Sequence, residues 1–132
     1  MLRRHKSRGF TLIELMIVIS MILILVSLAV PMYQQSIRRA KEAVLRDDLF
    51  TLRSSIDQFT LDKQRAPQSL DDLVQAGYLR EIPIDPMTNT RDTWVVANED
   101  YLQSIDQTQP GITDVHSGSE LSALDGTPYS SW

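Results

Sequence analysis

The chain has 132 residues, and its 17 acidic and 13 basic residues give a net charge of −4. This length accommodates one small domain beside a membrane segment. The acidic balance excludes the basic surface that a nucleic-acid-binding protein needs, and the absence of cysteine excludes the disulfides on which small secreted domains often rely.

Residues 10–30 form a long apolar stretch. As a helix rising about 1.5 Å per residue, the stretch spans roughly 31 Å, close to the thickness of the hydrocarbon core of a bilayer. We therefore expect it to cross a membrane as one helix. The cations before it are Arg3, Arg4, Lys6 and Arg8, and the polar residues within it are Thr11, Glu14, Ser20 and Ser27.

Glu14 is the unusual residue of this stretch, because a carboxylate inside a membrane segment costs about 2.5 kcal/mol or more. No basic residue lies within the stretch to pair with it. If the chain is cut between Gly9 and Phe10, the new amino group of Phe10, with a pKa of about 7.7, lies one helical turn away. That amine, or the amine of a neighbouring copy, could neutralise Glu14, which also complements the helix dipole.

An ordinary secretory signal is the alternative interpretation of this region. It would consist of a basic region, an apolar region and a small-x-small cleavage site at residues 27–29, Ser-Leu-Ala. The apolar run is longer than such signals usually are and carries an acid near its start, so a cut between Gly9 and Phe10 is favoured.

Residues 9–14, Gly-Phe-Thr-Leu-Ile-Glu, resemble the processing motif of type IV pilins and of the pseudopilins of type II secretion systems. The resemblance implies that a prepilin peptidase cuts after Gly9, that Phe10 becomes the methylated N-terminus, and that Glu14 is needed for assembly. Pro31 also matches, because the family usually has a proline just past the apolar run.

The resemblance further implies that the leader, residues 1–9, lies in the cytoplasm and the C-terminal domain in the periplasm. Charge alone leaves this orientation open, because Arg38, Arg39 and Lys41 lie just past the other end of the stretch. We expect a single-pass protein of the bacterial inner membrane that later enters a periplasmic filament.

Apolar residues continue at steps of three and four beyond Pro31, which predicts an amphipathic helix over residues 31–63. Charged residues on its other faces are expected to be solvated, with Glu42 and Arg46 at a spacing that favours an ion pair. The predicted apolar side contains Ile37, Ala40, Val44, Leu45, Leu49, Leu52, Ile56 and Phe59.

Pro31 lies inside this long helix and lacks the N–H that would bond back to Ser27. We expect either a kink or loosened turn there, or a simple bend with the helix intact. The resemblance implies that residues 26–30 can unwind in assembled filaments.

Residues 64–132 are predicted to form a small globular domain. Ser69 is expected to cap a short helix over residues 70–76, which Gly77 ends and whose apolar side packs on the long helix. Residues 77–86, Gly-Tyr-Leu-Arg-Glu-Ile-Pro-Ile-Asp-Pro, resemble a run of the major pseudopilin, although Met87-Thr88-Asn89 stand where that family usually has tryptophan and Gly-Asn.

Two short strands are predicted at residues 93–96 and 112–116, separated by a polar loop over residues 99–110. The tail, residues 121–132, contains an Asp125-Gly126 turn signal and two aromatic residues, Tyr129 and Trp132, that we expect to cover the core. The predicted fold class is α+β and pilin-like, with one long N-terminal helix on a small antiparallel sheet of two or three strands.

No catalytic constellation emerges, because His5 and His116 are far apart in sequence and His5 belongs to the leader. We expect no enzymatic role, and we expect His116 to be a polar residue at a strand end. The resemblance to the major pseudopilin implies a calcium ion in the C-terminal loop, which oxygen donors would hold. The candidates are Asp114, Ser117, Glu120 and Asp125, with Asp114 and Asp125 first; the alternative is that they are turn and surface residues.

The sequence therefore predicts a structural subunit of a type II secretion pseudopilus, a homo-oligomeric helical filament that promotes protein export. The implied partners are a prepilin peptidase, minor pseudopilins, and an inner-membrane secretion platform with its ATPase. One alternative is a type IV pilus subunit for adhesion, motility or DNA uptake, although the missing cysteine pair favours a pseudopilin. Another is a monomeric membrane-anchored binding domain.

Overall fold

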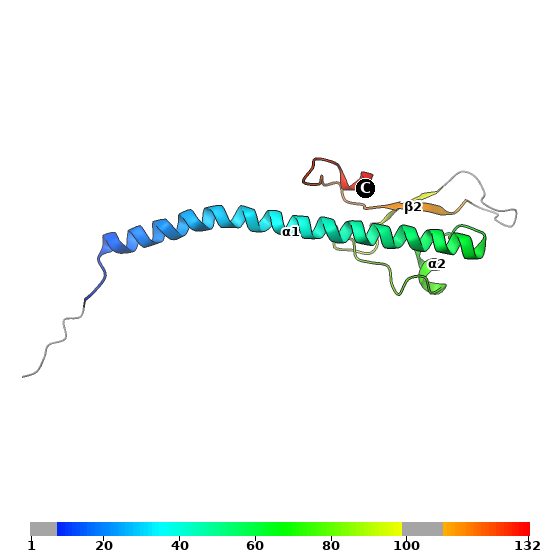
Figure 1. The fold of residues 1–132 in the computed structure, drawn as a ribbon, viewed down its shortest axis with the longest axis horizontal. Helices are drawn as coiled ribbons and strands as arrows, with labels where there is room; N and C mark the ends of the chain where they lie inside the picture. The colour runs from blue at the N-terminus through cyan, green and yellow to red at the C-terminus, as the bar shows by residue number, and fades with distance from the viewer. Residues whose placement is uncertain (1–7, 99–109) are drawn as a thin grey trace, which may run out of the picture. The chain divides into compact units, whose positions relative to one another are not determined.

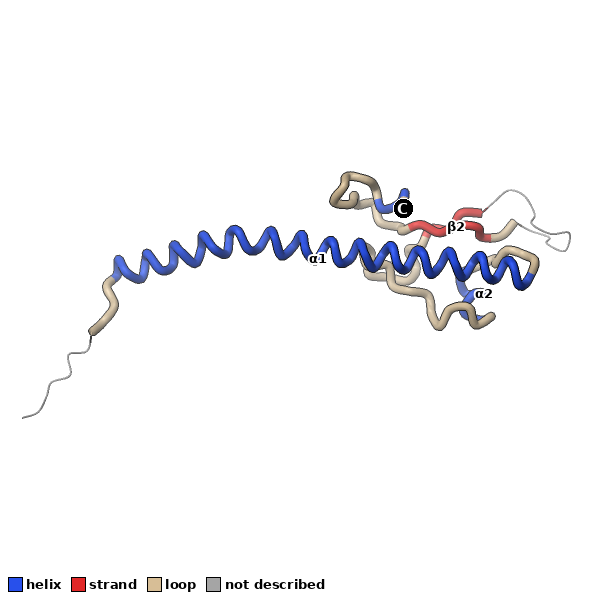
Figure 2. The backbone as a smooth tube through the Cα atoms, in the orientation of Figure 1, coloured by secondary structure: helices blue, strands red, loops and turns tan. Residues whose placement is uncertain are grey.

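The computed structural model describes residues 8–98 and 110–132, so most of the leader and most of the predicted polar loop over residues 99–110 lie outside the described residues. The chain forms two compact units, of which the first ends at Ile37 and the second comprises Arg38–Trp132. Figures 1 and 2 show the elements, which are helices α1 (Leu12–Lys63) and α2 (Leu70–Gln75), strands β1 (Val95–Asn98) and β2 (Ile112–His116), and a 3-10 helix, η1 (Tyr129–Ser131).

Helix α1 begins at Leu12, two residues later than predicted, because Thr11 caps it. The Glu14 N–H donates to Thr11 Oγ1 at 3.3 Å, and the Leu15 N–H donates to the Thr11 carbonyl at 3.2 Å. A threonine that accepts from the third residue of a helix stabilises its first turn. Phe10 therefore precedes the helix.

The N-terminal part of α1 is apolar on all sides. Its apolar window has a mean hydropathy of 2.8 and none of it is buried within the structure, so α1 is long and apolar enough to cross a membrane by length and composition. The helix continues through Pro31, and residues 26–30 are helical. Of the outcomes expected at Pro31, the intact helix is the one observed.

The core of the second unit forms on one stripe of α1. Its apolar side chains recur at steps of four and three, as the sequence predicts, and meet Leu73 of α2 and Val115 of β2. Ile37, Ala40 and Val44 were expected in this stripe but are exposed, because each lies well to one side of the buried direction. The buried apolar residues of α1 are Leu45, Leu49, Leu52, Ile56 and Phe59.

The predicted N-cap of the short helix is confirmed. The Asp72 N–H donates to Ser69 Oγ, and the Ser69 N–H donates to the Asp72 carboxylate, which together form a capping box. The helix ends at Gln75, one residue earlier than predicted, and Gly77 follows with a φ of +85°, a conformation that favours glycine.

Strands β1 and β2 form a two-stranded antiparallel sheet that pairs Val95 with His116 and Val96 with Val115. Strand β2 has the predicted bounds. Strand β1 begins two residues later than predicted because Trp94 turns into the core, where its indole N–H donates to the Pro83 carbonyl at 2.8 Å.

The tail forms no third strand among the described residues. One isolated bridge joins Ser122 to Pro128 across the predicted turn, where Gly126 has a φ of +89°. Tyr129 is buried in the core and Trp132 packs against it edge to face, so both aromatic residues cover the core as predicted.

Candidate functional site

The predicted cleavage bond lies in an exposed, non-helical segment just before α1. Gly9 and Phe10 both have open surroundings, and Phe10 is 86% exposed. A Cβ added to Gly9 would meet no atom within 4 Å. The fold itself therefore does not require glycine at this position, so any requirement for it would come from the enzyme that binds the segment.

Phe10 and Glu14 lie close together in the structure. They line one shallow hollow of about 330 Å³ with Arg8 and Gly9. In the uncut chain Arg8 brings a cation to this hollow, and a cut after Gly9 would remove Arg8 and leave a new amine on Phe10. The geometry thus allows the amine of Phe10 to replace the Arg8 guanidinium as the positive group near Glu14.

Asp114, a candidate calcium ligand, lies at the edge of the sheet and is paired with Arg53 of α1. Arg53 Nε donates to Asp114 Oδ1 at 2.7 Å, and His116 Nε2 lies 3.4 Å from Asp114 Oδ2. Burial by itself would raise the pKa of Asp114, but hydrogen bonds from the Val115 N–H and from Arg53 outweigh it and lower that pKa below 3.8.

Asp125, the other first candidate, lies in the turn of the tail. Its Oδ1 accepts hydrogen bonds from the Thr127 N–H at 2.9 Å and from Thr127 Oγ1 at 2.6 Å. The hydroxyl and N–H of Thr127 lower the pKa of this carboxyl from its usual value. Asp125 therefore acts as a turn residue.

Ser117 and Glu120, the remaining candidates, do not join the two aspartates. The Ser117 hydroxyl is buried and donates to Asp85, whose other carboxylate oxygen accepts from the Met87 N–H at 2.8 Å. Residues 8–98 and 110–132 contain no group of three or more histidine, cysteine, aspartate or glutamate side chains that could hold a metal. Asp114 faces a guanidinium and Asp125 is bound to Thr127, so the two first candidates do not form one group of donors in the described residues, and the calcium site stays a prediction.

The charged face of α1 holds the C-terminal segment, a role that sequence reasoning missed. Arg53 Nη2 donates to the carbonyls of Val115 at 3.0 Å and Trp132 at 2.6 Å. The same Trp132 carbonyl lies 2.6 Å from Nδ1 of His116, which ends β2 as predicted.

Glu42 and Arg46, which the sequence predicts as an ion pair, instead bind separate parts of the tail. Glu42 Oε1 accepts from the Leu124 N–H at 2.9 Å and from the Tyr129 hydroxyl at 2.8 Å. The Arg46 guanidinium lies over the Trp132 ring, 4.4 Å from its centroid.

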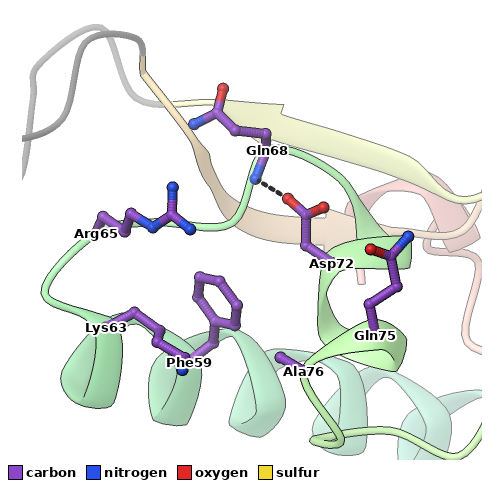
Figure 3. A pocket seen from close by; sticks show the side chains of 7 residues that line it. All are labelled: Phe59, Lys63, Arg65, Gln68, Asp72, Gln75 and Ala76. Atoms are coloured by element: carbon purple, nitrogen blue, oxygen red, sulfur yellow. Dashed lines mark hydrogen bonds between the residues drawn. The ribbon is translucent and has the colours of Figure 1, made fainter.

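A second hollow, of about 490 Å³, lies between the end of α1 and α2 (Figure 3). Its acid, Asp72, already accepts from the Gln68 N–H at 2.9 Å as part of the helix cap. No nucleophile with an adjacent base lines this hollow. Its lining residues are Phe59, Lys63, Arg65, Gln68, Asp72, Gln75 and Ala76.

Residues 4–30 match the family described as the prokaryotic N-terminal methylation motif. The chain is 34% identical over 143 aligned residues to the type II secretion system core protein G of Klebsiella michiganensis. The alignment covers 96% of this chain and 90% of that protein. It is also 34% identical over 100 residues to the core protein G of Escherichia coli K12, with 64% and 69% covered.

The chain also resembles a type IV fimbrial protein over a shorter region. It is 39% identical over 61 residues to the type IV major fimbrial protein FimA of Dichelobacter nodosus, covering 46% of this chain and 38% of that protein. No solved structure gives a significant match.

Proposed function

This chain belongs to the family of the type II secretion system core protein G, and we propose that it is a structural subunit of the pseudopilus of such a system. A prepilin peptidase cuts between Gly9 and Phe10 and the new N-terminus is methylated. The processed subunits leave the inner membrane and polymerise into a periplasmic filament that promotes export. Minor pseudopilins, an inner-membrane platform and its ATPase are the expected partners.

The observation that carries this proposal is the shared hollow of Phe10 and Glu14 beside an exposed cleavage bond. In a membrane an unpaired carboxylate is costly, so an amine beside Glu14 stabilises the assembled state. Apolar side chains that leave lipid to pack on one another gain little hydrophobic free energy. Close packing of residues 10–30 and the contact of Glu14 therefore determine the register between subunits.

The test is the mass of the N-terminal peptide of the protein purified from cells with and without prepilin peptidase. We expect a peptide that begins with methylated Phe10 only where the peptidase is present. Retention of Met1 in both strains, or a first residue just after Ala29, would contradict the proposal.

A type IV pilus subunit is the second candidate, and the similarity to the fimbrial protein FimA favours it. Core protein G matches over most of the chain, whereas that likeness covers 46% of it, so the secretion role is better supported. Deletion of the gene discriminates the two. Loss of protein export with surface pili intact supports the pseudopilus, and the reverse phenotype supports the pilus.

A further inference from the structure

The hollow between the end of α1 and α2 contains two basic side chains that form no ion pair among the described residues. Lys63 and Arg65 line this hollow of about 490 Å³, both are exposed, and neither takes part in a salt bridge in residues 8–98 and 110–132. Lys63 lies in the last turn of α1, where a cation complements the helix dipole. Arg65 lies beyond the end of the helix and has no such role, so its charge is available to an anion from outside the chain.

The acids beside the hollow are already bound to other groups of the chain. Asp72, which lines the hollow, accepts from the Gln68 N–H at 2.9 Å and from the Ser69 N–H at 3.2 Å. Asp62, in the last turn of α1, accepts from the Tyr78 hydroxyl at 2.7 Å. Neither carboxylate therefore needs the two cations as partners.

Phe59 gives the hollow an apolar wall. Its side chain is 4% exposed, and its ring meets Tyr78 edge to face with the ring centroids 5.6 Å apart. Figure 3 shows this ring between the basic residues and α2, from which the exposed amide of Gln75 also lines the hollow. An amide can donate to and accept from a peptide bond, and an apolar wall can hold an apolar side chain.

The size and the charge of the hollow indicate the class of its ligand. Seven residues line it, whereas a stable interface between two folded proteins uses about 20–30 residues on each side, so a short segment fits it better than a folded surface. Two cations and the carboxylate of Asp72 leave one positive charge in excess. This balance matches a singly charged carboxylate better than a doubly charged phosphate.

We propose that this hollow binds a short peptide segment of another protein, in which an acidic side chain is next to an apolar one. The acidic side chain lies between Lys63 and Arg65, and its apolar neighbour packs on Phe59. The amide of Gln75 bonds to the backbone of the peptide. The site goes beyond the pseudopilus role and does not depend on it, because it involves neither the cleavage bond nor Glu14.

The test is an NMR titration of the isotope-labelled full-length protein in detergent micelles. The probes are a capped Gly-Glu-Leu-Gly peptide, the same peptide with glutamine in place of glutamate, acetate and inorganic phosphate. We expect the acidic peptide to shift the backbone amide signals of residues 63–65 and 75–76 saturably, with at least fivefold tighter binding than any other probe. Equal binding of the two peptides, or equal binding of acetate or phosphate, would overturn the proposal.

The double variant Lys63→Gln/Arg65→Gln tests the two cations directly. It should bind the acidic peptide at least fivefold more weakly and keep the wild-type melting temperature, because both side chains are exposed. Lys41→Gln/Arg80→Gln is the matched control, since it removes the same charge at exposed positions outside the hollow. It should bind like the wild type. Equal loss of binding in both variants, or wild-type binding by Lys63→Gln/Arg65→Gln, would refute the site.

Dilution of the free protein distinguishes a foreign peptide from a second copy of this chain. The amide signals of residues 63–65 should not move on dilution. If they did, a second copy would occupy the hollow and the proposal would be wrong. Processing at Phe10 is measured separately by mass, so failure of the peptide site would leave the proposed function standing.

Discussion

Glu14 is the acid nearest to the expected new amine. Its backbone N–H takes part in the Thr11 cap, and its carboxylate forms no salt bridge among the described residues. We predict that Glu14→Ala and the similarly sized Glu14→Gln both reduce filament assembly at least tenfold, because each removes the carboxylate charge. Processing at Gly9–Phe10 should continue. The measurement is filament yield together with the mass of the N-terminal peptide.

Ser20→Ala is the control for Glu14, because the Ser20 hydroxyl donates to the Met16 carbonyl one turn earlier and has no other hydrogen bond among the described residues. It should assemble normally. Filaments from Glu14→Gln at the wild-type level would show that the negative charge is not required. A chain that only anchors a monomeric domain would tolerate all three substitutions.

The carboxyl group of Asp114 should make the free energy of unfolding depend on pH in acidic solution. Its pKa is lower in the folded than in the unfolded chain, so its contribution is present above about pH 4 and disappears as the pH falls through the folded-state pKa. Asp114→Asn should therefore lower stability at pH 6 by no more than about 1 kcal/mol, since the side chain is 42% exposed and screened by solvent.

Thermal unfolding of the wild type and of Asp114→Asn at pH 6 and pH 3 measures this difference. The free energies of unfolding of the two proteins should differ more at pH 6 than at pH 3. If the difference in stability between the two proteins were the same at both pH values, or larger at pH 3, the assigned pairing of Asp114 with Arg53 would be contradicted.

At the scale of elements, the close approach of two loops fixes where the strands pair. Gly118 follows β2, and a Cβ added to it would collide with the carbonyl oxygen of Thr93, which precedes β1. Both partners are backbone and cannot rotate away. We predict that Gly118→Ala lowers the free energy of unfolding by about 1–3 kcal/mol.

Chemical denaturation of the purified protein tests this prediction, with Ser130→Ala at an exposed position as the control. The control should stay within about 0.5 kcal/mol of the wild type. If Gly118→Ala were equally neutral, the loop would have room to move and the contact with Thr93 would not hold the strands in register.

At the scale of the whole molecule, contacts between distant parts of the sequence fasten the C-terminal segment. Arg53 joins α1 to Asp114, Val115 and Trp132. We predict that chelating calcium leaves the melting temperature of the full-length protein unchanged, whereas Arg53→Ala destabilises it by about 1–3 kcal/mol through lost charge-assisted hydrogen bonds.

Arg80→Ala is the control for Arg53, because Arg80 is exposed and forms no salt bridge among the described residues. Its effect should be within about 0.5 kcal/mol. A calcium-dependent rise in melting temperature that Asp114→Asn abolishes would instead restore Asp114 as a metal ligand.

The sequence by itself determined the features that depend on near neighbours in the chain. The apolar run, the helical spacing that ends at Lys63, the Ser69 cap and the Asp125-Gly126 turn all rest on interactions within a few residues, whose geometry is the same in most proteins. The processing motif around Phe10 is equally local. These features were enough to predict the α+β fold and the family.

Only the tertiary structure decided which charged side chains of α1 reach the core's edge. Arg53 and Glu42 meet partners 61 to 87 positions away, and no local pattern distinguishes them from the solvated charges beside them. The late start of β1 follows from the burial of Trp94 for the same reason. These contacts depend on which distant surfaces come together on folding, and the periodic pattern along one helix does not indicate which surfaces those are.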